Sequence, residues 1–230
     1  MAETALIVGT GGGLSASLAR LFHKEGMRIA LASRRPENIA ALVSETDANS
    51  YSCDASIAEE VATLFQSVSD EIGPPDLVVY NPSYRARGGI ADLDPAEVMK
   101  AITVTCFGGF LVGQQAARSM LKAGHGTILF TGASASVKGF AKSSSFAMGK
   151  FGLRGLAQSM ARELAPQNIH VAHFVIDGGI RQPNDARGNQ RGPDGLLEPD
   201  AIAQSYLHIH RQQRSAWTAE MEIRPWVESY

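Results

Sequence analysis

The stretch Val8-Gly9-Thr10-Gly11-Gly12-Gly13-Leu14-Ser15 decides the fold of this chain. It joins a short apolar run, Ala5–Val8, to a segment with helical periodicity, Leu14–Glu25. Glycines at such a junction let the backbone turn tightly and approach a phosphate group, whose charge is stabilised by the N-terminus of the helix. Tight strand-to-helix turns also need glycine for structural reasons, so the turn alone is weak support. Its place at the start of a long alternation of strands and helices favours a phosphate-binding function.

Outward from this turn, apolar or β-branched runs alternate with helical patterns along the chain. The expected strands, each buried on both faces of a parallel sheet, are Ala5–Val8, Arg28–Ala32, Asn49–Cys53, Leu77–Tyr80, Thr127–Phe130 and Val171–Ile176. The expected helices are Leu14–Glu25, Glu37–Glu45, Ala58–Ile72, Pro95–Lys122, Ser145–Leu164 and Asp200–Arg211, and Thr218–Ile223 is the expected final edge strand. This order predicts an α/β fold, a Rossmann-type doubly wound parallel sheet of about seven strands flanked by helices, in a single domain over residues 1–230.

Residues 177–200 depart from the alternation. This segment is rich in Gly, Pro, Asn, Asp and Arg and has little apolar periodicity. Loops of this length in a compact domain are either functional or disordered. The hypothesis is a lid loop that covers a small-molecule substrate, and disorder is the alternative.

Composition excludes several classes of protein. With 230 residues, 44% of them hydrophobic, the chain can bury a core without disulfides or metals. A net charge of −2 gives no basic surface for nucleic acid or an anionic membrane. The two cysteines, Cys53 and Cys106, lack metal-ligand spacing and suit a reducing compartment. Without a signal-peptide pattern or a run of about 18 apolar residues, the sequence predicts a cytoplasmic protein with no nucleic-acid or membrane partner.

Several motifs carry a resemblance to a known family. The turn Gly9-x-x-x-Gly13-x-Ser15 is similar to a Gly-x-x-x-Gly-x-Gly turn, with Ser15 in place of the third glycine. Cys53-Asp54 is similar to an acidic position after the third strand that meets an adenine ring, and Tyr80-Asn81-Pro82-Ser83 lies where Asn-Asn-Ala-Gly is usual. The likeness continues to Val175-Ile176-Asp177-Gly178 and so covers nearly the whole chain. In these residues the chain resembles the short-chain dehydrogenase/reductase family, and its ending, residues 215–226, is similar to an atypical bacterial branch.

The resemblance implies a nicotinamide cofactor, and the end of the second strand indicates which one. Ala32-Ser33-Arg34-Arg35-Pro36 has no carboxylate for the ribose hydroxyls of NAD, whereas an arginine fork suits the 2′-phosphate of NADP. Arginines that are merely solvated at a helix start are the alternative, but a positive pair there opposes the helix dipole. We expect NADP(H), with Arg34 as the main determinant. The expected cofactor-binding residues are Gly9, Gly13, Leu14, Ser33, Arg34, Arg35, Asp54, Asn81, Lys150, Gly178 and Ile180.

The catalytic groups that the resemblance implies are largely missing. The family uses a tyrosine, a lysine four residues later, a serine and an asparagine. Lys150 matches the lysine, but Phe146 holds the tyrosine position, Ala133, beside Ser134, the serine position, and Thr105 the asparagine position. Losing a general acid costs about 10²–10⁴ in rate, and losing a donor to a developing oxyanion costs roughly 10²–10³. Ordinary carbonyl reduction by the standard route is therefore not expected.

Three residues are the candidates for a substitute chemistry: Lys150, Tyr84 and Ser134. Tyr84 follows the fourth strand, and loops after strand ends line the ligand crevice in this fold, so Tyr84 is the best candidate for a relocated proton donor. A loop tyrosine that packs on its neighbours is the alternative, and Lys150 could itself donate a proton. Asp177 is expected to cap a turn, with a catalytic base as the alternative.

Two functions stay open at this point. The first is an NADP(H)-dependent oxidoreductase with a non-standard proton donor, acting on a small carbonyl or enone-like substrate. The second is an inactive NADP(H)-binding sensor or partner protein. The retained Lys150 and the glycine turn fit both functions. The vacant positions favour the second, whereas the expected lid loop over residues 177–200 favours the first, which is the function we expect.

The sequence also gives expectations about metal binding and about assembly. The histidines His170, His173, His208 and His210 have no acidic or cysteine partners at ligand spacing, so no metal is expected. The resemblance implies a homodimer or homotetramer built on two long helices. The apolar residues that could pair there are Phe107, Phe110, Leu111, Phe151, Leu156 and Met160. Packing of these side chains on the sheet alone is the alternative.

Overall fold

A computed structural model, which describes residues 2–182 and 191–228, shows a seven-stranded sheet in which all neighbouring strands are parallel. The strand order is β3-β2-β1-β4-β5-β6-β7. The strands are β1 Thr4–Val8, β2 Arg28–Ser33, β3 Asn49–Ser52, β4 Leu77–Tyr80, β5 Gly126–Thr131, β6 Ile169–Ile176 and β7 Glu220–Ile223. The order reverses at β1, since the chain leaves β3 and returns on the other side as β4. The expected doubly wound α/β fold is confirmed.

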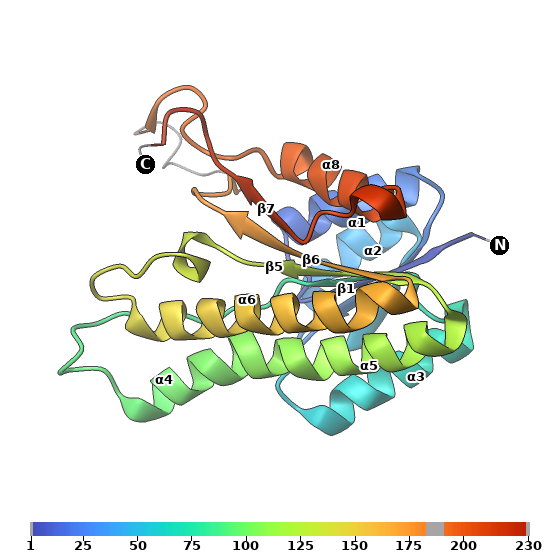
Figure 1. Cartoon of the computed structure of the whole chain (residues 1–230), viewed down its shortest axis with the longest axis horizontal. Helices are drawn as coiled ribbons and strands as arrows, with labels where there is room; N and C mark the ends of the chain where they lie inside the picture. The colour runs from blue at the N-terminus through green and yellow to red at the C-terminus, as the bar shows by residue number, and fades with distance from the viewer. Residues whose placement is uncertain (1, 183–190, 229–230) are drawn as a thin grey trace.

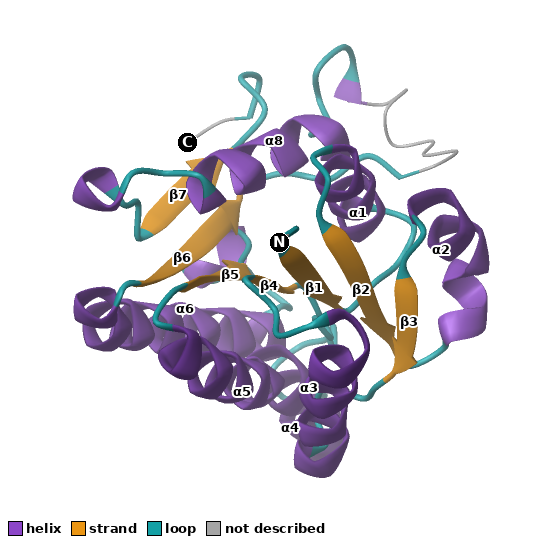
Figure 2. Ribbon diagram, turned by 90° about the vertical axis from the view of Figure 1, so that its right-hand side faces the viewer, coloured by secondary structure: helices purple, strands orange, loops and turns teal. Residues whose placement is uncertain are grey.

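Helices cover both faces of the sheet (Figures 1 and 2). They are α1 Leu14–Lys24, α2 Ala40–Thr46, α3 Ala58–Ile72, α4 Pro95–Ile102, α5 Gly108–Ala123, α6 Ser144–Leu164 and α8 Pro199–His210. One layer contains α1, α2 and α8, and the opposite layer contains α3, α4, α5 and α6. Each layer closes a separate apolar cluster against its face of the sheet.

The central strands supply both clusters because their side chains alternate between the two faces. In β1, Ala5 and Ile7 pack with α1 and α8, whereas Leu6 and Val8 pack on the other side. The rings of Phe174 in β6 and Tyr206 in α8 stack with their centroids 3.7 Å apart. These contacts hold the carboxyl ends of β1, β4, β5 and β6 in fixed register, and the loops that follow them form the site described below.

Three expectations about these elements are wrong. No residue of β3 is fully buried. β3 lies at the edge of the sheet, where it has a neighbouring strand on one side only. The helix expected over Pro95–Lys122 is divided by a π-helical segment, Thr103–Phe107, between α4 and α5. The expected helix Glu37–Glu45 likewise consists of a 3₁₀ turn, Pro36–Ile39, followed by α2.

The expected loop over residues 177–200 is described only at its two ends. Ile180 and Leu197 form an isolated parallel bridge, so these ends lie side by side. Residues 183–190, the middle of the expected lid, lie outside the described residues.

One stretch of the described residues, Pro95–Ala123, is long and apolar enough to cross a membrane by length and composition alone. The stretch has no charged residue between Lys100 and Arg118, but Thr103, Thr105, Gln114 and Gln115 interrupt it, so it is not the continuous apolar run whose absence was expected. Leu111, Val112 and Ala116 from this stretch lie in the core against the sheet. Within this fold, α5 is a core helix.

Candidate active site

Two adjoining cavities, of about 750 and 410 Å³, open along the carboxyl ends of the strands. Both are lined by Gly9, Gly11, Gly12, Asn81 and Ser83, so they form one continuous groove. The larger cavity extends over the ends of β2 and β3, and the smaller one extends over β5, β6 and the start of α6. A groove at the point where the strand order reverses is the usual ligand site of doubly wound sheets.

The glycine-rich turn forms the floor where the two cavities meet. Gly9 has φ +83°, and a Cβ on it would lie 2.6 Å from Cγ of Pro82, so only glycine fits there without strain. Ser15, at the third glycine position, donates from Oγ to the Gly9 carbonyl at 3.0 Å and accepts from Nδ2 of Asn81 at 2.7 Å. The serine therefore closes the turn by tying its start to the loop after β4.

The larger cavity is lined at one end by hydroxyl and guanidinium groups that could bind a phosphate. Arg34 and Arg35 lie exposed on its rim, and Ser33 is buried with no hydrogen-bond partner for Oγ among the described residues. A buried hydroxyl beside guanidinium groups fits a phosphate monoester, which accepts from both. Burial acts to raise the pKa of Asp54, but donation from Ser56 and the charge of Arg34 outweigh it, and the pKa lies below its ordinary value. Asp54 is therefore ionised and available to accept hydrogen bonds.

Lys150 lies at the base of the smaller cavity. Its side chain is buried, and Nζ donates to the Thr131 carbonyl at 2.6 Å. Burial and, to a lesser degree, the charge of Arg85 lower the pKa of Lys150 to about 7. The amine can therefore exchange a proton near neutral pH, which an ordinary lysine does not do.

Arg85 is a site residue that the sequence analysis missed. It lines the smaller cavity, and its Cζ lies 3.8 Å from the centroid of the Phe146 ring. Nζ of Lys150 lies 5.8 Å from the same centroid. The aromatic residue at the family's tyrosine position thus has two cations beside it. The only signal in the sequence was the position of Arg85 in the loop after β4, next to Tyr84.

The other residues considered for catalysis do not all lie in the cavity that contains Lys150. Ala133 lines the smaller cavity, but Tyr84, Ser134 and Thr105 do not. The Tyr84 hydroxyl donates to Glu97 on α4, and the Thr105 hydroxyl accepts from the Tyr84 backbone N–H at 3.1 Å. This geometry gives no support to Tyr84 as a proton donor. The eleven expected cofactor-binding residues, by contrast, all line one cavity or the other.

Asp177 has a structural role at the edge of the groove. Its buried carboxylate lies 3.3 Å from Nζ of Lys138 and 3.0 Å from Nη2 of Arg224, and it is hydrogen-bonded to Ser134. Burial acts to raise its pKa, yet these partners outweigh burial and hold the pKa below its ordinary value. A carboxylate with a lowered pKa is a poor base, and the expectation that Asp177 caps the next turn is wrong because its bonds go to other segments.

Two of the buried histidines belong to structural contacts. His170 stacks on Trp217 with ring centroids 4.6 Å apart, and Nδ1 of His173 lies 3.1 Å from a carboxylate oxygen of Glu220. Across residues 2–182 and 191–228, no group of three or more His, Cys, Asp or Glu side chains could hold a metal ion.

A doubly wound parallel sheet with a glycine-rich turn at its reversal point defines the Rossmann class of proteins. A family model described as short chain dehydrogenase matches residues 3–188. The chain belongs to the short-chain dehydrogenase/reductase family.

Individual relatives agree with this assignment. The chain is 35% identical to a short-chain dehydrogenase from Rhodopseudomonas palustris, whose crystal structure aligns with a TM-score of 0.85 over 97% of this chain and 99% of that one. It is 26% identical to a metagenomic short-chain oxidoreductase in complex with NADP, with a TM-score of 0.85 over 98% of both chains. An uncharacterised oxidoreductase of Staphylococcus aureus is 26% identical over 97% of both chains.

Proposed function

We propose that this protein is an NADP(H)-dependent oxidoreductase that acts on a small carbonyl or enone-like substrate with a proton donor other than tyrosine. The observation that carries the proposal is the continuous groove. It has Arg34 at one end, the glycine turn in the middle and the buried Lys150 at the other end. The chain would work as a single domain in the reducing cytoplasm, where Cys53 and Cys106 stay free.

The residues along the groove account for cofactor selection. Ser33, Arg34 and Arg35 would hold the 2′-phosphate, and the N-terminus of α1 would hold the pyrophosphate. The relative from a metagenome is in complex with NADP, which supports the choice. NADPH, when bound, supplies a hydride. Lys150 lines the other end of the groove, where it would donate to the ribose hydroxyls as the family resemblance implies, and Asn81 lines both cavities.

The substitute proton donor is Lys150 itself. Its ammonium form would donate from Nζ to the oxygen or carbon that gains negative charge as the substrate is reduced. With a pKa lowered to about 7, both forms of the amine are populated near neutral pH. A conjugated enone suits such a site. Hydride addition at the β-carbon of an enone depends less on a strong acid at the carbonyl oxygen than reduction of a simple ketone does.

Cofactor choice is tested by one substitution. Arg34→Ala is expected to weaken NADPH binding about ten- to a hundredfold, because charge-assisted hydrogen bonds to the 2′-phosphate are lost. NADH affinity should not change. Titration of the purified protein with each cofactor, followed by nucleotide fluorescence, measures both values. Arg162→Ala, an exposed arginine on α6, is the matched control, and comparable NADPH affinity in the Arg34 and Arg162 variants would contradict the assignment.

A binding protein without turnover is the second candidate function, and the methyl group of Ala133 in the cavity favours it. A reductase screen with ketones and enones separates the two candidates. Turnover of any acceptor supports the enzyme. Tight NADPH binding without turnover, and with none gained in a Phe146→Tyr, Ala133→Ser double variant, supports the sensor or partner protein.

We further propose a homodimer or homotetramer that forms through α5 and α6. Leu111, Leu156 and Met160 pack on the core, as the alternative interpretation expected. The rings of Phe107 and Phe110 are exposed and stacked with centroids 6.0 Å apart, and Phe151 of α6 is also exposed. These three rings would form the apolar contact between copies of the chain.

Light scattering at micromolar concentration checks this assembly. The wild type should show a dimer or tetramer, and a Phe107→Glu, Phe151→Glu double variant should shift it to monomer, because burying two carboxylates at the interface is unfavourable. Ile90→Glu, at an exposed apolar residue in the loop after β4, is the control that should change nothing. A monomeric wild type would refute the proposal.

A further inference from the structure

The guanidinium of Arg85 has a defined position in the smaller cavity. Its Cζ lies over the Phe146 ring, 3.8 Å from the ring centroid. The ring is buried and belongs to the first turn of α6, so it offers a fixed platform. A guanidinium that stacks by its face keeps its N–H edge free for hydrogen bonds in its own plane.

Hydrogen bonds from buried side chains hold the backbone on both sides of Arg85. The Tyr84 N–H donates to Oγ1 of Thr105 at 3.1 Å, and Oγ of Ser145 donates to the Ala86 carbonyl at 2.7 Å. Thr105 and Ser145 are both fully buried. The residues at the family's asparagine and tyrosine positions therefore act together on Arg85. Thr105 holds the backbone of its loop, and the Phe146 ring lies against its guanidinium group.

The charges in the cavity favour an anionic ligand. Arg85 and Lys150 both line it, and its described lining contains no carboxylate. Arg85 makes no salt bridge with any residue that the structure describes, and the charge of Arg87 acts on it from the same loop. A planar guanidinium edge matches the two oxygens of a carboxylate.

We propose that Arg85 binds a carboxylate of the substrate, so that the reacting carbonyl or alkene belongs to an organic acid anion. This inference rests on the proposed function for the reaction itself. The carboxylate would lie in the plane of the guanidinium, above the edge of the Phe146 ring, in the same cavity as Nζ of Lys150. Selection of an acid over the matching amide would follow from the charge of Arg85.

Pairs of ligands that differ in charge but hardly in shape provide the test. Crotonate and crotonamide form one pair, and benzoate and benzamide form the other. Each is titrated calorimetrically into the wild type, Arg85→Gln, Arg85→Lys and Arg87→Gln, with and without saturating NADP⁺. Arg85→Lys keeps the charge but not the planar edge. Arg87→Gln is the matched control, since Arg87 lies in the same loop but does not line the cavity.

The carboxylates are expected to bind the wild type and Arg87→Gln about ten- to a hundredfold more tightly than the amides. Arg85→Gln should lose this preference while its melting temperature stays unchanged, and Arg85→Lys should keep part of it. Equal binding of acid and amide to the wild type, or a preference that survives in Arg85→Gln, would overturn the inference. A tenfold loss of NADP⁺ affinity in Arg85→Gln with the acid preference intact would assign Arg85 to the cofactor instead. Failure of NADP⁺ to bind the wild type would refute the proposed function alone, because the acid preference is also measured without it.

Discussion

Replacement of Lys150 by methionine is expected to lower turnover about a hundred- to ten-thousandfold, the range associated with loss of a general acid. Methionine has a similar length and no charge, so it suits the buried position. Steady-state reduction of an accepted substrate at saturating NADPH measures the effect. Lys150→Arg is the informative companion, because it keeps a positive charge for the ribose hydroxyls but does not release a proton near neutral pH. It should retain cofactor affinity and still turn over slowly.

The pH profile provides the distinguishing readout. The donor is the ammonium form, and burial followed by the charge of Arg85 lowers the pKa of Lys150 to about 7. Turnover should therefore fall as the pH rises through this value. His173, whose charge also interacts with Lys150, is neutral in this range because burial lowers its pKa to about 4. A wild-type rate that stays constant from about pH 6 to about pH 8, with the chemical step rate-limiting, would contradict the role of Lys150 as donor.

Replacement of Gly9 by alanine is expected to destabilise the fold by about 2–5 kcal/mol. A positive φ costs an alanine about 1–2 kcal/mol, and the new Cβ would press on the ring of Pro82, which adds about 1–3 kcal/mol. For a chain of this length, the melting temperature should fall by roughly 4–20 °C. Thermal unfolding without cofactor measures this change separately from any loss of binding.

Gly12→Ala is the matched control. It lies in the same turn, its φ is not in the left-handed region, and no atom lies within 4 Å of an added Cβ. Its melting temperature should stay within a few degrees of the wild type. Equal losses in both variants would show that the turn tolerates no side chain at any position and that the contact with Pro82 is not the cause.

The central strands could be predicted closely from the sequence, whereas the exposure of the edge strand β3 and the division of the longest helix could not. β4 has the predicted bounds, Leu77–Tyr80, because a run that is apolar at every position has only one stable place in such a sheet. β3 has a similar length but a polar sequence, and its edge position depends on strand order, which no local pattern contains. The π-helical segment Thr103–Phe107 lies within a continuous apolar helix pattern, and its fit against α6 is a tertiary effect.

The two ends of the candidate site also differ in how well their residues could be predicted from the sequence. Gly9, Arg34 and Asp54 follow the ends of successive strands, so position along the chain determines where they lie in space. The loop after β4 is irregular, and no periodicity tells which of two adjacent side chains faces the cavity. Tyr84 was the better chemical candidate, yet its side chain lies against α4 and Arg85 enters the cavity. The partners of Asp177 come from residues 39 and 47 positions away in the sequence, beyond the reach of a turn propensity.

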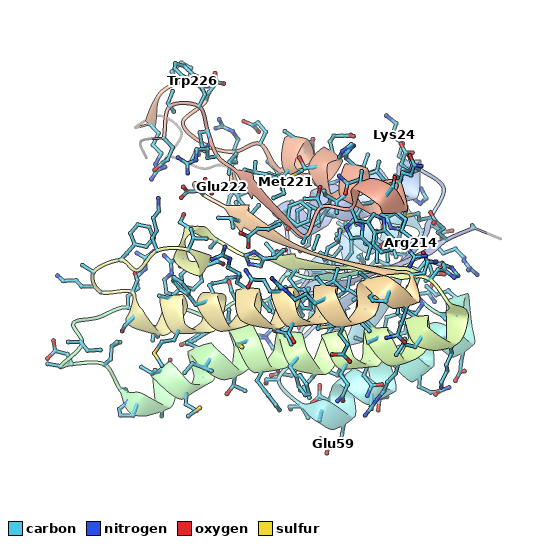
Figure 3. The ribbon with its side chains drawn as sticks, viewed as in Figure 1. Lys24, Glu59, Arg214, Met221, Glu222 and Trp226 are labelled. Carbon is cyan, nitrogen blue, oxygen red and sulfur yellow. The ribbon has the colours of Figure 1, made fainter. Side chains whose placement is uncertain are left out.

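The last strand and the residues after it complete the groove. The Asp177 N–H donates to the carbonyl of Ile223, Arg224 pairs with the Asp177 carboxylate, and a Cβ on Gly178 would lie 2.7 Å from Cδ of Pro225. Figure 3 shows Met221 and Glu222 at β7 and Trp226 at the top of the view, whereas Glu59 lies at the bottom. During synthesis on the ribosome, the glycine turn and the first six strands emerge well before residues 223–225. The nascent chain can therefore build most of its sheet while the wall at Asp177 and Gly178 still lacks its partners, and the ligand site matures only when the final strand leaves the exit tunnel.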